Sequence, residues 1–107
     1  MLLSPSCRAE LMMFGARAVV TLHGGLDLAS TAWLRDYLDG VLLLNPRVVT
    51  VDLAALECCD SSGIAVFAEY RRRAEHEGRT LWLRAPSPAL RHLLELTALT
   101  DLLDDAH

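Results

Sequence analysis

The chain has 107 residues, of which 52% are apolar, and its net charge is −4. These values predict one globular domain spanning residues 1–107 and argue against a disordered chain or a nucleic-acid partner. No apolar run approaches the ~18 residues of a membrane span, and the first residues do not resemble a signal peptide, so we expect a cytoplasmic protein without a membrane partner.

The chain begins with a pattern typical of a β-hairpin. Residues 8–14 are a short apolar run that ends at Gly15, and residues 18–24 are rich in β-branched side chains. The connection between them is short enough for a hairpin turn.

A helix is predicted next, with Ser30 and Thr31 able to cap its first turn, and it continues to about Leu44. Apolar residues recur at helical spacing and form one stripe: Trp33, Leu34, Tyr37, Leu38, Val41 and Leu42. The pair Asn45–Pro46 ends this helix, because proline disfavours helical geometry in the residue before it.

The second half of the chain alternates strands and helices. Residues 48–54 are apolar almost throughout, which predicts a strand buried on both faces in a parallel part of the sheet. The residues after Asp60 predict a helix that ends near Gly78, and residues 80–84 predict the next strand. The side chains of this helix that should face the interior are Ile64, Phe67, Ala68 and Tyr70.

The last predicted helix has Ser87 as its cap and Pro88 at its first position, and the tail, residues 97–107, is expected to fray. The order β-β-α-β-α-β-α predicts an α/β fold with a mixed sheet of four to five strands, flanked by about four helices. Its last two strands should form a right-handed parallel crossover.

Neither the cysteines nor the glycines indicate a cofactor site. Cys58 and Cys59 are adjacent and cannot form an unstrained disulfide, and without a CxxC pair a zinc site is not expected. Both are predicted to be buried small apolar residues. The chain lacks GxGxxG and P-loop sequences, so no nucleotide cofactor is expected.

The most informative stretch is Asp60-Ser61-Ser62-Gly63, at the start of the second predicted helix. These residues can simply cap the helix, because Asp and Ser accept hydrogen bonds from its free N–H groups. A serine here can also accept a phosphate, which would face free N–H groups and the positive end of the helix dipole. The phosphate would add about −1.5 to −2 charges and change what the surface binds.

A serine hydrolase is a third interpretation, and a weak one. It would need a histidine base near the serine, an acid to orient that histidine and an oxyanion hole. His23 ends a strand, His76 lies about four helical turns beyond Ser61, and the turn is not GxSxG.

Asp27 follows a strand and a glycine pair, so it is either a turn acid that bonds local N–H groups or part of a binding surface. The second interpretation is open because strand-to-helix connections meet at one edge of an α/β sheet, where partners usually bind. Arg71, Arg72 and Arg73 are expected to form a solvated face that complements the helix dipole.

Residues 49–99 resemble the second half of the STAS domains of bacterial anti-sigma factor antagonists. The segment LHGGLDLASTAWLRDYL resembles that family's G-E-L-D segment and first helix. The turn of Asp60, Ser61, Ser62 and Gly63 after a buried strand is the most specific feature of this resemblance.

The resemblance implies a regulator without catalysis of its own. In such proteins, the serine after the aspartate, here Ser61, is phosphorylated by an anti-sigma factor that has serine kinase activity. The unphosphorylated form binds that kinase and frees the sigma factor, and a PP2C-type phosphatase restores it. The implied partner-binding residues are Asp27, Asp60, Ser61, Ser62 and Gly63.

Three places depart from the family pattern: Gly25 replaces an acid, Ala98 replaces a common glycine after the last helix, and Cys58–Cys59 replaces apolar or aromatic residues. A second hypothesis stays open, in which the chain is a non-switching STAS adaptor of a larger assembly, such as a lipid-transport ATPase complex. The sequence is compatible with a monomer or a weak dimer.

Overall fold

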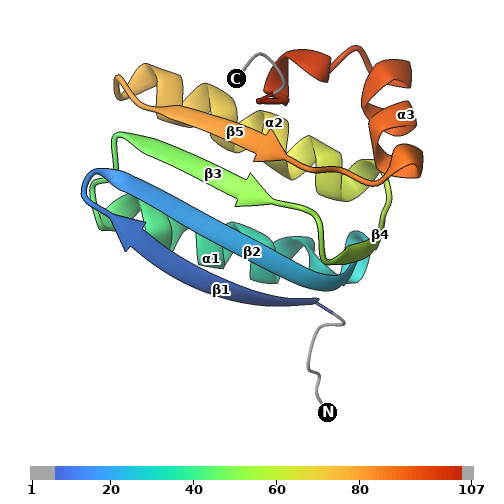
Figure 1. The fold of residues 1–107 in the computed structure, drawn as a ribbon, viewed down its shortest axis with the longest axis horizontal. Coiled ribbons are helices and arrows are strands. Elements are labelled where there is room, and N and C mark those ends of the chain that lie inside the picture. Colours follow the sequence, from blue (N-terminus) through green and yellow to red (C-terminus); the bar gives the residue numbers. More distant parts are fainter. Residues whose placement is uncertain (1–6, 105–107) are drawn as a thin grey trace.

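The computed structural model describes residues 7–104 and contains a five-stranded mixed sheet with helices α1 and α2 packed behind it in Figure 1. The strands are β1 (Cys7–Phe14), β2 (Arg17–Leu26), β3 (Val48–Asp52), β4 (Leu56–Cys59) and β5 (Thr80–Arg84). The helices are α1 (Thr31–Leu43), α2 (Ser61–His76) and α3 (Pro88–Leu96), with two short 3-10 helices, η1 (Leu28–Ser30) and η2 (Thr100–Leu102). The predicted α/β fold is confirmed, with β4 added to the predicted order and three α-helices in place of about four.

The sheet has the order β1-β2-β3-β5, in which only the β1–β2 pair is antiparallel. The hairpin turn consists of Gly15 and Ala16, one residue shorter than predicted. Gly15 has φ 60°, which suits the first central position of a two-residue hairpin turn. β3 is central, which agrees with the prediction of a strand buried on both faces.

Strand β4 was not predicted, because it depends on a partner far away in the sequence. β3 pairs with the first half of β2, from Arg17 to Thr21, and leaves the second half of β2 uncovered on that side. β4 fills this position by pairing with Gly24, Gly25 and Leu26. Its four residues carry no alternating pattern of their own, so only the free backbone groups of β2 define it as a strand.

The core lies between the sheet and the apolar stripes of α1 and α2. In α1 Leu34, Leu38, Val41 and Leu42 are buried, and the other two predicted residues, Trp33 and Tyr37, are partly buried against the core. In α2 Ile64, Phe67 and Tyr70 are buried while Ala68 is partly buried. The predicted inward faces of both helices are therefore confirmed. No helix in the described range, residues 7–104, is long and apolar enough to cross a membrane.

α2 and α3 end in the same backbone motif but with different residues in the left-handed position. In α2 this residue is Gly78 with φ 74°, and Arg79 N–H donates to the carbonyl of Ala74 at 2.8 Å. In α3 it is Ala98 with φ 58°, and Leu99 N–H donates to Leu94 at 2.9 Å. The turn after α3 therefore keeps the glycine-type conformation despite its alanine, at a conformational cost.

The prediction that the tail frays is wrong for residues 100–104. Leu102 and Leu103 are buried, Leu103 forms a parallel bridge with Leu83 of β5, and Asp104 N–H donates to the Leu83 carbonyl at 2.9 Å. The apolar residues of this segment cover the outer edge of β5, which outweighs the usual freedom of a chain end. Residues 105–107 lie outside the described part of the chain.

Candidate functional site

Asp60 caps α2 with its side chain. It sits in extended geometry, and its carboxylate accepts hydrogen bonds from the N–H groups of Ser62 at 3.0 Å and Gly63 at 3.4 Å. The Ser62 hydroxyl also donates to the same carboxylate oxygen. This hydroxyl contact, with the N–H groups of Gly63 and Ser62, lowers the pKa of Asp60 below its ordinary value against an opposing effect of burial.

Ser61 and Ser62 differ in what their hydroxyl groups do. Ser62 is half-buried and its hydroxyl is engaged with Asp60. Ser61 is exposed at the first position of α2, and its hydroxyl has no hydrogen-bond partner within residues 7–104. The capping interpretation thus describes Asp60 and Ser62, and leaves the Ser61 hydroxyl accessible from solvent.

Gly63 lets α2 begin in close contact with the sheet. A methyl group at this position would lie 2.7 Å from the Cys59 sulfur and 3.1 Å from Leu26 Cβ. Gly63 itself is buried. It therefore positions the first turn of α2, and the exposed surface is made by Ser61 and Asp60.

Asp27 lies at the same edge of the sheet as Asp60. The two residues directly before them, Leu26 and Cys59, are paired across β2 and β4, and Asp60 N–H donates to the Leu26 carbonyl at 3.1 Å. The Asp27 carboxylate caps η1 through the Ser30 N–H at 3.1 Å, and the Ser30 hydroxyl accepts from Asp27 N–H at 2.9 Å. Both proposed roles of Asp27 are thus compatible, because it is an exposed acid with a capping function.

The cysteine predictions are half right. Cys59 is partly buried, and burial, followed by the charge of Asp60, raises the pKa of its thiol to about 12. Cys58 is exposed, contrary to the expectation that both are buried. Cys58 and Cys59 are adjacent in β4, so their side chains point to opposite faces of the sheet and meet different environments.

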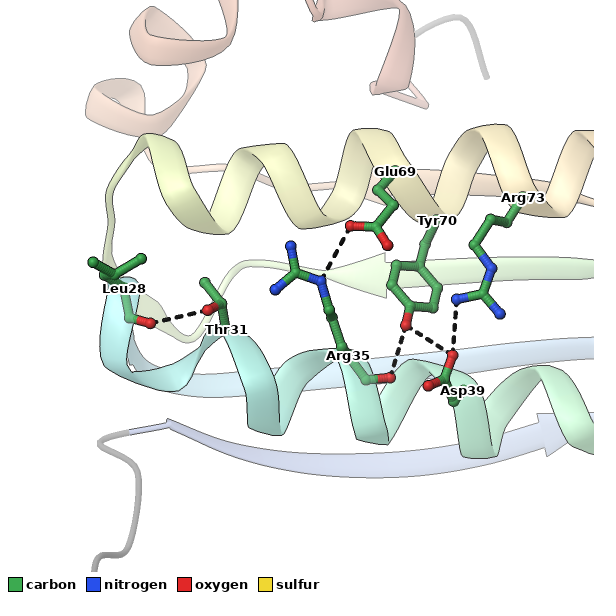
Figure 2. Close-up of polar contacts among 7 residues, drawn as sticks. All are labelled: Leu28, Thr31, Arg35, Asp39, Glu69, Tyr70 and Arg73. Carbon is green, nitrogen blue, oxygen red and sulfur yellow. Dashed lines mark hydrogen bonds and ion pairs between the residues drawn. The ribbon is translucent and has the colours of Figure 1, made fainter.

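A polar seam between α1 and α2 holds the second helix in place, as Figure 2 shows. Tyr70 is buried, and its hydroxyl donates to Asp39 at 2.7 Å and to the Arg35 carbonyl at 3.1 Å. Arg73 stacks on the Tyr70 ring at 4.5 Å and also donates to Asp39, while Arg35 pairs with Glu69. Arg73 is therefore part of a specific contact, rather than only a solvated face.

The hydrolase interpretation would need His23 or His76 as a base for Ser61. The His23 ring is 2.6 Å from Glu10, its neighbour on β1, and His76 is the last residue of α2, about 22 Å along the axis from Ser61. A hollow of about 140 Å³ lies nearby between β4 and the start of α3, and a larger one of about 460 Å³ lies at the far end of α2. The site is thus an open surface, which suits a macromolecular partner better than a small substrate.

A family model described as "Mlab, STAS domain" matches residues 11–104 of this chain. The chain belongs to the STAS-domain family. The comparison with curated proteins found no match.

Solved structures with this STAS fold include regulators and a transporter protein. The anti-sigma factor antagonist SpoIIAA in its unphosphorylated form has a TM-score of 0.80 at 22% identity, covering 94% of this chain and 89% of that one. The phosphorylated form of the Bacillus cell fate determinant SpoIIAA has a TM-score of 0.72 at 22% identity, covering 94% and 92%.

An anti-sigma factor antagonist from Mycobacterium paratuberculosis has a TM-score of 0.78 at 22% identity, covering 96% of this chain and 88% of that one. A sulfate transporter family protein from Wolinella succinogenes has a TM-score of 0.66 at 20% identity, covering 84% and 73%. At these identities the likeness shows the fold.

Three residues that shape this site in the STAS domain were not found from the sequence. Leu26 and Cys59 set the space around Gly63, and this depends on the packing of β2 against β4. Ser30 was assigned to the cap of the following helix, whereas it completes the capping box of Asp27. The three-residue spacing of Asp27 and Ser30 is the signal that could have identified it.

Proposed function

We propose that this STAS domain is an anti-sigma factor antagonist that is switched off by phosphorylation of Ser61. In the unphosphorylated state it binds an anti-sigma factor with serine kinase activity, and the sigma factor is released. A PP2C-type phosphatase removes the phosphate. Asp60, Ser61 and Asp27 lie on the docking surface, while Ser62 and Gly63 hold its geometry.

The proposal rests on the different roles of Asp60, Ser62 and Ser61 at the start of α2. Asp60 and Ser62 satisfy the helix end, so Ser61 is exposed and is not needed as a cap. A kinase can therefore reach its hydroxyl, and modification removes no hydrogen bond within the described residues. For the same reason we assign the phosphate to Ser61 rather than to Ser62.

The surroundings of a phosphate on Ser61 differ from those expected from the sequence. The N–H groups of Ser62 and Gly63 already donate to Asp60, so they are not free to neutralise a phosphate as the sequence suggested. The added charge of about −1.5 to −2 would instead lie beside the Asp60 carboxylate on an exposed surface. A partner that contacts Ser61 through apolar or acidic groups is then excluded by repulsion and by the cost of dehydrating the phosphate.

The test is the intact mass of the chain after incubation with ATP and each candidate anti-sigma kinase. We expect one added phosphate, which Ser61→Ala abolishes and Ser62→Ala does not. In binding assays, Ser61→Asp should lose the kinase partner, whereas Ser61→Asn, which has nearly the same shape without the charge, should keep it. Equal affinities of the Asp and Asn variants would contradict the charge switch.

A second candidate is a STAS adaptor subunit that is not modified, for example in a lipid-transport ATPase complex. The matching family model is described as "Mlab, STAS domain", and a sulfate transporter family protein has the same fold. Both findings support an adaptor role as the second candidate. Co-purification with an ATPase, together with an unmodified Ser61 in cells, would support it over the switch.

A further inference from the structure

Among residues 7–104, strand β1 pairs on one side only and forms an edge of the sheet. It pairs with β2 on one side, whereas the opposite edge strand, β5, is covered by the bridge between Leu83 and Leu103. Edge strands offer free N–H and C=O groups to another strand, and proteins usually block them with proline, lysine, a bulge or a short length. β1 has eight residues in unbroken register with β2 and no proline, and its two charged side chains, Arg8 and Glu10, lie in its first half, which leaves the second half without a charge.

The last residues of β1 are also unusually apolar for an edge. Met12 is 60% exposed, Met13 is 41% exposed and Phe14 is 57% exposed. Ala9 and Leu11, on the same face of the strand as Met13, are packed against the core, so the core extends to this edge strand. A second strand added here would cover these side chains and extend the core.

We propose that β1 is a self-association edge, at which two copies of this chain pair β1 antiparallel to β1 about a two-fold axis and form one continuous sheet. This proposal does not rest on the phosphorylation switch. The chemistry of β1 favours a second copy because its only charges, Arg8 and Glu10, have opposite signs, so an antiparallel copy can avoid placing like charges opposite each other.

The two-fold axis restricts the register. Opposite residues in an antiparallel pair point to the same face, so one residue of β1 must face its own copy. Glu10 at the axis would face a second Glu10, which is unfavourable. Ala9 at the axis would leave Met12, Met13 and Phe14 without a partner among residues 7–14.

Leu11 at the axis pairs residues 8–14 completely. Arg8 then lies opposite Phe14 of the second copy, where a guanidinium can stack on an aromatic ring, and Glu10 lies opposite Met12. Ala9 lies opposite Met13 and Leu11 opposite Leu11, so the apolar face continues across the axis. We therefore assign this register.

The first experiment is sedimentation equilibrium of the full chain over a dilution series, with variants of opposite charge at one site. A monomer–dimer equilibrium is expected. Met12→Glu places a carboxylate opposite Glu10 twice per dimer and should raise the dissociation constant about tenfold. Met12→Lys at the same exposed site should keep or tighten the dimer, and Leu43→Glu, on an 84% exposed side chain of α1, should leave it unchanged.

The second experiment tests the register by disulfide formation in a Cys58→Ser background, because Cys58 is the exposed cysteine. Leu11→Cys should cross-link two copies on mild oxidation, since residues facing each other across a strand pair lie within disulfide reach. Met13→Cys is more exposed, yet it is displaced by four residues from its own copy and should not cross-link.

A monomeric mass at every concentration would overturn the proposal, as would equal dissociation constants for the Glu and Lys variants. Cross-linking of Met13→Cys as fast as Leu11→Cys would overturn the register. Far-UV circular dichroism of each variant establishes that it remains folded.

Discussion

Adding one methyl group at Gly63 tests whether the start of α2 is held by close packing on the sheet. In Gly63→Ala the new Cβ would lie 2.7 Å from the Cys59 sulfur and 3.1 Å from Leu26 Cβ. One of these groups must therefore move, or the first turn of α2 must lift away from β4. Gly40 is the matched control, because it lies within α1 and a Cβ there meets no atom within 4 Å.

The two substitutions should change the free energy of unfolding in opposite directions. Replacing a helical glycine by alanine contributes up to about 1 kcal/mol of stability, which Gly40→Ala should show in full. Overpacking at a tight site costs about 1–3 kcal/mol, so Gly63→Ala should lose about 1 kcal/mol after the same helix gain is subtracted. The two variants should thus differ by about 2 kcal/mol.

Urea unfolding followed by circular dichroism measures this difference, which corresponds to about 1 M between the two midpoints. Cys59→Ala allows a double-mutant comparison, since it removes the sulfur that the new methyl group meets. Gly63→Ala should then cost less in the Cys59→Ala background, with a coupling of about 1 kcal/mol. If Gly63→Ala stabilises the fold as much as Gly40→Ala, the close packing at the site is not what restricts residue 63.

Three further predictions concern stability and can be checked by denaturant unfolding at several pH values. Ala98→Gly should stabilise the fold by about 1 kcal/mol, because it relieves an alanine with φ 58°; no gain would argue against strain there. Asp60→Ala should cost about 1 kcal/mol near neutral pH. Since the pKa of Asp60 is lowered from 3.8 in the fold, its contribution is present above that pH and is lost as the pH falls below it, so the variant and the parent should converge in acid. Tyr70→Phe should cost about 1 kcal/mol by removing the hydrogen bond to Asp39. Burial, with the bond to Asp39, raises the pKa of Tyr70 from 10.0 to about 12, so the parent should lose stability as the pH rises through this range and the variant should lose less.

The local features of this protein follow from residues that are close together in the chain. The apolar stripes of α1 and α2 follow from helical spacing, and the ends of these helices follow from Asn45–Pro46 and from Gly78. A cap at this turn was also expected, with Asp60 and the serines as candidates, because their side chains accept hydrogen bonds from the free N–H groups of a helix start, and Asp60 is the residue that does so. Each of these features depends on residues within about one helical turn.

The exposure of each group at the candidate site depends on how the helices and strands pack. The hydroxyls of Ser61 and Ser62 differ once the first turn of α2 is formed, because Ser62 donates to Asp60 while Ser61 is exposed, and Gly63 packs this turn against Cys59 and Leu26. The same holds for β4, which exists because β3 leaves half of β2 unpaired.

The exposure of Cys58 and the burial of Leu103 depend likewise on which strand edge each residue reaches. Hydrogen bonds between strands and contacts between layers join residues that are distant in the chain. Sequence spacing therefore predicts the elements, and their packing determines the surface that a partner meets.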